Sequence, residues 1–185
     1  MKDFTIIGSV ALHCAFKNRF RSPKNDIDIL VRNEQIKKEI EAEKLKIFGT
    51  TDITNELVFD KIKEIKNSKY LTYIPPEYLY LRFEYHNFGE ITEQIIADAN
   101  TFLGDDNYLI ATPSVILQIK QIHIGWDIFW EKHSNDIIFL LNSGIRAKNF
   151  QWKKALFDWH LKKHGKKWAS LSDKTENQFF KDSVK

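Results

Sequence analysis

The chain has 185 residues, of which 43% are hydrophobic and 14% aromatic, so it can bury a core and wholesale disorder is excluded. The 28 Lys and Arg residues exceed the 25 Asp and Glu residues by three, which is too little to indicate nucleic-acid binding by itself. The single cysteine, Cys14, excludes a disulfide framework or a multi-cysteine zinc site within one chain. Because we find neither a signal peptide nor an apolar run of about 18 residues, we expect a cytoplasmic protein without a membrane span.

The first part of the chain predicts a strand, a helix and a second strand. Residues 4–7 (FTII) are an apolar run that ends at Gly8-Ser9, and residues 10–16 can open a helix there. Residues 26–31 (DIDILV) alternate between polar and apolar and are rich in β-branched residues, as strands are. Since strand side chains repeat with period two, Asp26 and Asp28 should share one face.

The rest of the chain predicts two helices, a run of strands and then further helices. We expect helices over 34–48 and 51–66, and strands over 70–74, 79–85, 90–97 and 109–111. Thr112 and Pro113 are a typical N-cap and first residue of a helix, and the sequence beyond them is largely helical, with a break at Ser143-Gly144. The order of elements predicts an α+β core over residues 1–111 and a helical C-terminal region over 112–185.

Gly8 and Ser9, followed by Asp26 and Asp28, suggest phosphate chemistry. A glycine allows close backbone approach, the start of a helix offers free N–H groups with a partial positive charge, and the serine hydroxyl adds a donor. Two carboxylates on one strand face can hold Mg²⁺ together with substrate phosphates. A phosphate cradle beside a metal pair is what phosphoryl or nucleotidyl transfer requires.

The stretch IIGSVALH…KNDIDILV resembles the core signature of the DNA polymerase β-like nucleotidyltransferase superfamily, in its minimal single-domain form. Residues 108–120 (YLIATPSVILQIK) are similar to the family segment in which a proline starts a helix that carries a lysine, here Lys120. Residues 132–141 (KHSNDIIFLL) resemble the helix that follows it. The resemblance implies a nucleotidyltransferase-like mixed sheet with flanking helices. It also implies transfer of a nucleoside monophosphate from an NTP to an acceptor, which could be a small molecule, a protein or a nucleic acid.

The resemblance also implies a third carboxylate on a further strand, and two residues are candidates. Glu93 lies in EITEQIIA, just before the segment that carries Lys120, and is favoured; Glu84 lies in LYLRFEY and is the alternative. The expected catalytic residues and ligands of Mg²⁺ (or Mn²⁺) are therefore Asp26, Asp28 and Glu93. Gly8, Ser9 and Lys120 are the expected nucleotide-binding residues.

Two other functions stay open. If the third acid is absent, the chain could be an inactive member of this fold that binds nucleic acid, or the regulatory nucleotidyltransferase-like partner of a toxin–antitoxin pair. The basic segment over residues 146–185, with a net charge of +7 against −4 for the rest, could contact phosphates, although such segments are more often solvated helix faces.

Several residues have both a functional and a packing interpretation. His123, His133 and Asp136 could hold a metal ion or pack between helices. Trp152, Trp159 and Trp168 could stack on bases or form a helical core, and the core is favoured. Cys14 is expected to be a small core residue rather than a nucleophile.

Overall fold

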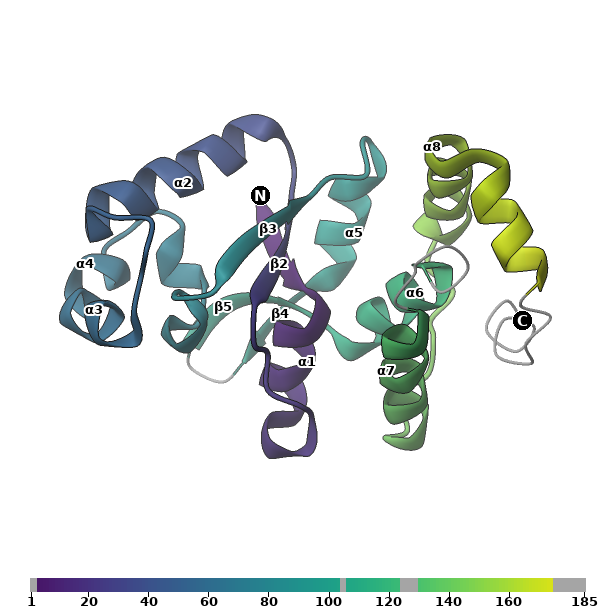
Figure 1. The fold of residues 1–185 in the computed structure, drawn as a ribbon, viewed down its shortest axis with the longest axis horizontal. Helices are drawn as coiled ribbons and strands as arrows, with labels where there is room; N and C mark the ends of the chain where they lie inside the picture. The colour runs from purple at the N-terminus through teal and green to yellow at the C-terminus, as the bar shows by residue number, and fades with distance from the viewer. Residues whose placement is uncertain (1–2, 104–105, 124–129, 175–185) are drawn as a thin grey trace. The chain divides into compact units, whose positions relative to one another are not determined.

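The computed structural model describes residues 3–103, 106–123 and 130–174, shown in Figure 1. Its contacts divide the chain into two compact units, Met1–Thr112 and Pro113–Lys185. The division lies one residue after the boundary expected from the sequence. The two units are described separately below.

The N-terminal unit is built on a mixed sheet with flanking helices, so the α+β prediction is confirmed. The strands are Phe4–Ile7 (β1), Asp26–Val31 (β2), Arg82–His86 (β3), Asn100–Leu103 (β4) and Asp106–Ala111 (β5). They lie in the order β3-β2-β1-β5-β4. β1 pairs with β2 and β4 pairs with β5 in antiparallel orientation, whereas β1–β5 and β2–β3 are parallel pairs. β2 is therefore an interior strand, and β3 forms one edge.

Helices cover both faces of this sheet. They are Gly8–Phe16 (α1), Glu34–Phe48 (α2), Asn55–Asp60 (α3), Ile62–Lys66 (α4) and Ile91–Ala99 (α5). Figure 1 shows the strands of this unit between α2 and α5. On one face, the Tyr85 hydroxyl donates to Glu41 of α2. On the other, Glu93 of α5 pairs with Arg32, which directly follows β2.

Two strand predictions were wrong. Residues 90–97 were expected to be a strand, but residues 91–97 lie in helix α5. The sequence of this segment fits the period of a strand and that of a helix. Ile91, Glu93 and Ile95 would share one face of a strand. The buried residues are instead Thr92, Ile95, Ile96 and Ala99, whose spacing is helical. The expected strand at 70–74 contains instead a short 3-10 helix, Leu71–Tyr73, and the strand expected over 79–85 begins only at Arg82.

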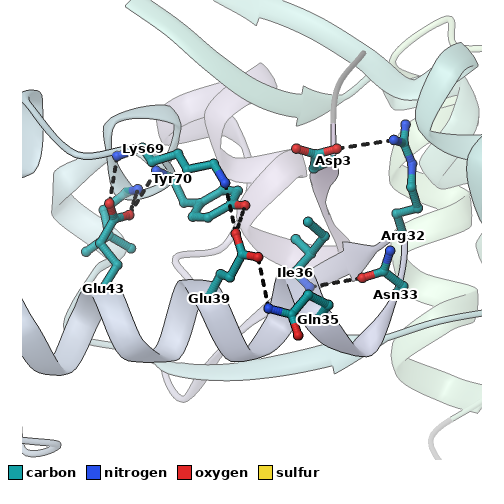
Figure 2. A network of polar contacts seen from close by, with 10 residues as sticks. Asp3, Arg32, Asn33, Gln35, Ile36, Glu39, Glu43, Lys69 and Tyr70 are labelled. Carbon is teal, nitrogen blue, oxygen red and sulfur yellow. Dashed lines mark hydrogen bonds and ion pairs between the residues drawn. The ribbon is translucent and has the colours of Figure 1, made fainter.

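Polar contacts hold α2 against the segment that precedes β3, as Figure 2 shows. The Glu43 carboxylate accepts hydrogen bonds from the backbone N–H groups of Lys69, Tyr70 and Leu71, at 2.6, 2.8 and 3.1 Å. One turn earlier, Glu39 accepts from the Lys69 ammonium at 2.8 Å and from the Tyr70 hydroxyl. These two carboxylates fix the position of one side of α2 over the sheet.

The C-terminal unit consists of helices in the part of it that the structure describes: Pro113–His123 (α6), Trp130–Asn142 (α7) and Trp152–Lys174 (α8). α6 is buried on every side from Val115 to Ile122. Trp152 and Leu156 of α8 are fully buried, which confirms the core interpretation for Trp152, whereas Trp168 lies outside the described side chains. Within residues 3–103, 106–123 and 130–174, no helix is long and apolar enough to cross a bilayer.

Candidate functional site

Two carboxylates of β2 lie beside the start of helix α1. β2 alternates between half-buried Asp26 and Asp28 and fully buried Ile27 and Ile29, so the two acids share one sheet face, as predicted. The antiparallel register places Asp28 opposite Ile7, the last residue of β1. The next residue, Gly8, begins α1.

Gly8 has room for nothing larger than hydrogen, because the Asp28 side chain occupies the adjacent space. A Cβ atom at position 8 would overlap the Asp28 carboxylate and would stand 2.8 Å from its Cγ atom. Gly8 also has a φ of +71°, which disfavours any residue with a side chain. The glycine therefore allows close approach of backbone and carboxylate, whereas the approach expected from the sequence was to a phosphate.

The first turn of α1 has features that favour binding of an anion. Its N-cap residue is Ile7, whose side chain cannot accept a hydrogen bond, whereas α2 and α3 are capped by the side chains of Asn33 and Thr54. No acidic residue lies in the first turn of α1. Ser9, the other expected phosphate ligand, is 6% exposed in this turn. Backbone N–H groups at a helix start favour negatively charged ligands.

The third acid beside β2 is Glu84 rather than Glu93. β3 runs parallel to β2, and its register pairs Asp26 with Arg82 and Asp28 with Glu84. Paired residues on neighbouring strands point to the same face, so Glu84 lies next to Asp28. Glu84, the alternative that was less favoured from the sequence, is therefore the acid that the sheet topology brings to Asp26 and Asp28.

Glu93 belongs to a different part of the unit. It lies in the first turn of α5, and its Oε1 atom is 3.3 Å from Nε of Arg32. Arg32 also contacts Asp3, at 3.2 Å. The prediction that Glu93 lies on a strand was wrong. The prediction that Glu93 acts together with Asp26 and Asp28 as a metal ligand and catalytic group has no support in this geometry.

Two basic side chains of β3 accompany the acids. Arg82 lies 3.9 Å from Asp26 and 3.8 Å from Glu84, and Nε2 of His86 lies 2.9 Å from Oδ1 of Asp28. Burial lowers the pKa of His86, but its hydrogen bond to Asp28 and the charges of the neighbouring acids raise that pKa above its ordinary value overall. His86 was not among the residues predicted from the sequence, although it follows Glu84 by two residues and so shares its face.

The donor set fits a hard divalent cation in its chemistry, because carboxylate oxygens are the preferred protein ligands of Mg²⁺. In this structure, however, the three carboxylates contact Arg82 and His86. Across the described ranges, no group of three or more His, Cys, Asp or Glu side chains lies close enough together to hold a metal ion. Asp26, Asp28 and Glu84 would have to rearrange to bind one jointly.

Lys120, expected to bind nucleotide, is a buried residue of the C-terminal unit. Its ammonium lies 2.8 Å from Oδ2 of Asp136 on α7 and 3.4 Å from Nδ1 of His133, and both members of the ion pair are almost fully buried. Nε2 of His123 lies 2.8 Å from Nε2 of His160 on α8. These contacts join α6, α7 and α8, and they support the packing interpretation of His123, His133 and Asp136.

Cys14 of α1 is not activated. Burial raises the pKa of its thiol to about 11, against a smaller lowering effect of a hydrogen bond with Tyr78. A thiol that stays protonated at neutral pH is a poor nucleophile. Cys14 is thus no nucleophile, as expected, although its side chain is half-buried rather than part of the core.

Comparison with protein-family models, curated proteins and solved structures finds no match to this chain.

Proposed function

We propose that the chain is a Mg²⁺-dependent nucleotidyltransferase that moves a nucleoside monophosphate from an NTP to an acceptor hydroxyl. The observation that carries the proposal is the approach of the Asp28 carboxylate to Gly8 at the start of α1. The register of β3 adds Glu84 beside Asp28, and Asp26 shares their face. A helix start without a side-chain N-cap and three carboxylates are the parts that this reaction needs.

In the proposed site, the backbone at Gly8 and Ser9 binds the triphosphate. Asp26, Asp28 and Glu84 would hold the magnesium, which supplies compensation for the phosphate charge when bound. One of these carboxylates accepts the proton of the acceptor hydroxyl. The oxygen then forms a bond to the α-phosphorus as the bond to pyrophosphate breaks. Lys120 has no role in this scheme, because its ammonium is paired with Asp136.

Occupation of the site by magnesium requires Arg82 to leave Asp26 and Glu84, and His86 to leave Asp28. Arg82 is 74% exposed and its contacts are at 3.8 to 3.9 Å, so its movement costs little. The His86 contact is shorter and half-buried. A triphosphate at the start of α1 would give Arg82 and His86 a new hydrogen-bond acceptor.

A second candidate function is a binding module that keeps the fold without the chemistry. The observation that favours it is that Arg82 and His86 contact the same three acids. Such a module would bind its ligand without breaking a phosphoanhydride bond.

The deciding experiment incubates the chain with each α-labelled NTP and Mg²⁺ or Mn²⁺, with the chain itself or total RNA as acceptor. Transfer of label with release of pyrophosphate supports the enzyme. Asp28→Asn should abolish both transfer and the increase in melting temperature that Mg²⁺ with NTP produces in the wild type. A melting shift without transfer under every condition supports the binding module. The absence of both, with all four NTPs, contradicts both functions.

A further inference from the structure

A pocket of about 460 Å³ lies between α2 and the edge strand of the sheet. One wall is the face of α2 that carries Lys37, Glu41 and Lys44, and the other is formed by residues 80–83 and Tyr85. Thr51, Asp52 and Ile53 line one end. Phe83 and Tyr85 alternate with Glu84 and His86 along β3, so the rings point to the face opposite the acid cluster. The pocket therefore lies on the face opposite the three acids, although Arg82 lines it and also contacts Asp26 and Glu84.

Lys44 carries a largely buried positive charge in this pocket. Its side chain is 12% exposed, and its ammonium lies 3.6 Å from Oε1 of Glu41, farther than a charge-assisted hydrogen bond. The same Glu41 oxygen already accepts from the Tyr85 hydroxyl at 2.6 Å. Burial lowers the pKa of Lys44 below its ordinary value despite Glu41. An anion in the pocket would supply the partner that Glu41 provides incompletely.

The walls of the pocket are aromatic as well as cationic. The Lys44 ammonium lies 3.7 Å from the centre of the Phe83 ring, and the Lys37 ammonium lies 5.9 Å from that of Tyr85. The Phe83 and Tyr85 rings meet edge to face, at 6.2 Å between centroids. Aromatic walls accept a flat ring by stacking, and a volume near 460 Å³ suits a small molecule.

We propose that the pocket between α2 and β3 binds a small molecule with an aromatic ring and an anionic group, and that Lys44 receives the anion. A carboxylate and a phosphate share this chemistry. Lys37 and Arg82 also line the pocket, Lys37 in an ion pair with Glu34 and Arg82 near Asp26 and Glu84. The lining has three basic residues and two acidic ones, Glu41 and Asp52, so its formal charge is slightly positive. This charge favours an anion over a cation.

The test measures binding of benzoate, phenyl phosphate, inorganic phosphate and benzyl alcohol to the full chain by NMR titration. We expect amide shifts in residues 37–53 and 80–85 with the two aromatic anions. Inorganic phosphate and benzyl alcohol should each bind at least about tenfold more weakly, because each lacks one of the two interactions. The relative affinity of benzoate and phenyl phosphate then distinguishes the two kinds of anion.

Lys44→Met keeps the aliphatic stem and removes the charge, and should weaken both aromatic anions by roughly tenfold or more. Lys46→Met, an exposed position on the same helix outside the pocket, is the matched control. Lys44→Arg should restore most of the affinity, and a melting curve for each variant verifies its folding. Equal binding by Lys44→Met and Lys46→Met, equal binding of benzyl alcohol and benzoate, shifts confined to other residues, or no binding at millimolar concentration would overturn the proposal. Asp28→Asn should leave benzoate binding unchanged, so this proposal and the proposed activity can fail independently.

Discussion

Asp28 and Gly8 are in such close contact that a side chain at position 8 would have to displace the carboxylate. The Cγ and Cβ atoms of Asp28 would lie 2.8 and 3.1 Å from a Cβ atom at position 8, so rotation of the carboxylate alone cannot relieve the overlap. This contact joins the last residues of β1, the start of α1 and the middle of β2. It gives a direct way to perturb the candidate site from its backbone side.

Gly8→Ala should therefore destabilise the chain by more than its backbone conformation alone explains. Gly49 has a similar φ, +68° against +71°, but nothing lies within 4 Å of a Cβ atom there. We expect Gly49→Ala to cost about 1–2 kcal/mol, from the positive φ. Gly8→Ala should cost about 1–3 kcal/mol more, from overpacking against Asp28. Urea unfolding of both variants measures the difference, and equal losses would show that the contact with Asp28 is not tight.

The third carboxylate can be tested with two variants that differ in position but not in chemistry. Glu84→Gln should lower the transfer rate by roughly 100-fold or more while NTP affinity is largely kept, because the loss affects the reacting state. Glu93→Gln should keep the rate and weaken only the contact with the mostly buried Arg32, which keeps its ion pair with Asp3. Single-turnover rates and nucleotide affinity are measured in parallel. Loss of transfer in Glu93→Gln with full activity in Glu84→Gln would contradict the assignment from the sheet register.

Removing one member of the buried Lys120–Asp136 ion pair should lower the free energy of unfolding strongly, because the other charge would stay buried without its partner. Lys120→Met leaves the Asp136 carboxylate buried with less compensation, so the free energy of unfolding should fall by about 3 kcal/mol. Lys154→Met removes the exposed pair with Asp158 and should change it by less than about 1 kcal/mol. Chemical denaturation compares the two. A loss of NTP affinity in folded Lys120→Met, with little change in stability, would instead support the nucleotide-binding role first expected for this lysine.

The contacts of Glu39 predict a dependence of stability on pH. Hydrogen bonds from Lys69, Tyr70 and Gln35 lower the pKa of Glu39 to about 2, from an ordinary value of 4.5. Since the folded-state pKa is the lower one, this stabilisation is fully present above the ordinary value and is lost as the pH falls from there through about 2. Glu39→Gln should flatten the stability profile in this window. Glu34→Gln on the same helix, where the ion pair with Lys37 is exposed, serves as the control.

The Cys14 thiol should react slowly with alkylating reagents. Burial raises its pKa to about 11, so little thiolate is present at pH 8. Iodoacetamide should modify the folded chain far more slowly than the chain in denaturant, as followed by mass spectrometry. Equal rates in the two states would show that the thiol is open to solvent and ionised.

The sequence by itself was sufficient for the features that depend on neighbours along the chain. The alternation of DIDILV placed Asp26 and Asp28 on one face of a strand, and the apolar run before Gly8-Ser9 located the first strand and the helix after it. The spacing of apolar residues likewise predicted α2 with its observed bounds, Glu34–Phe48. In each case a single period fits the segment, so local pattern and final structure agree.

Only the tertiary structure decided which acid joins this pair. Residues 90–97 fit a strand or a helix equally well in sequence, and burial of Thr92, Ile95, Ile96 and Ala99 selected the helix, which left Glu93 against Arg32. The choice of Glu84 rests on the parallel register between β2 and β3, whose paired residues are more than fifty positions apart. Strand register between distant segments depends on how the whole sheet packs, and no local pattern encodes it. The same holds for Lys120, because its partner Asp136 belongs to another helix and only the packing of α6 against α7 brings the two together.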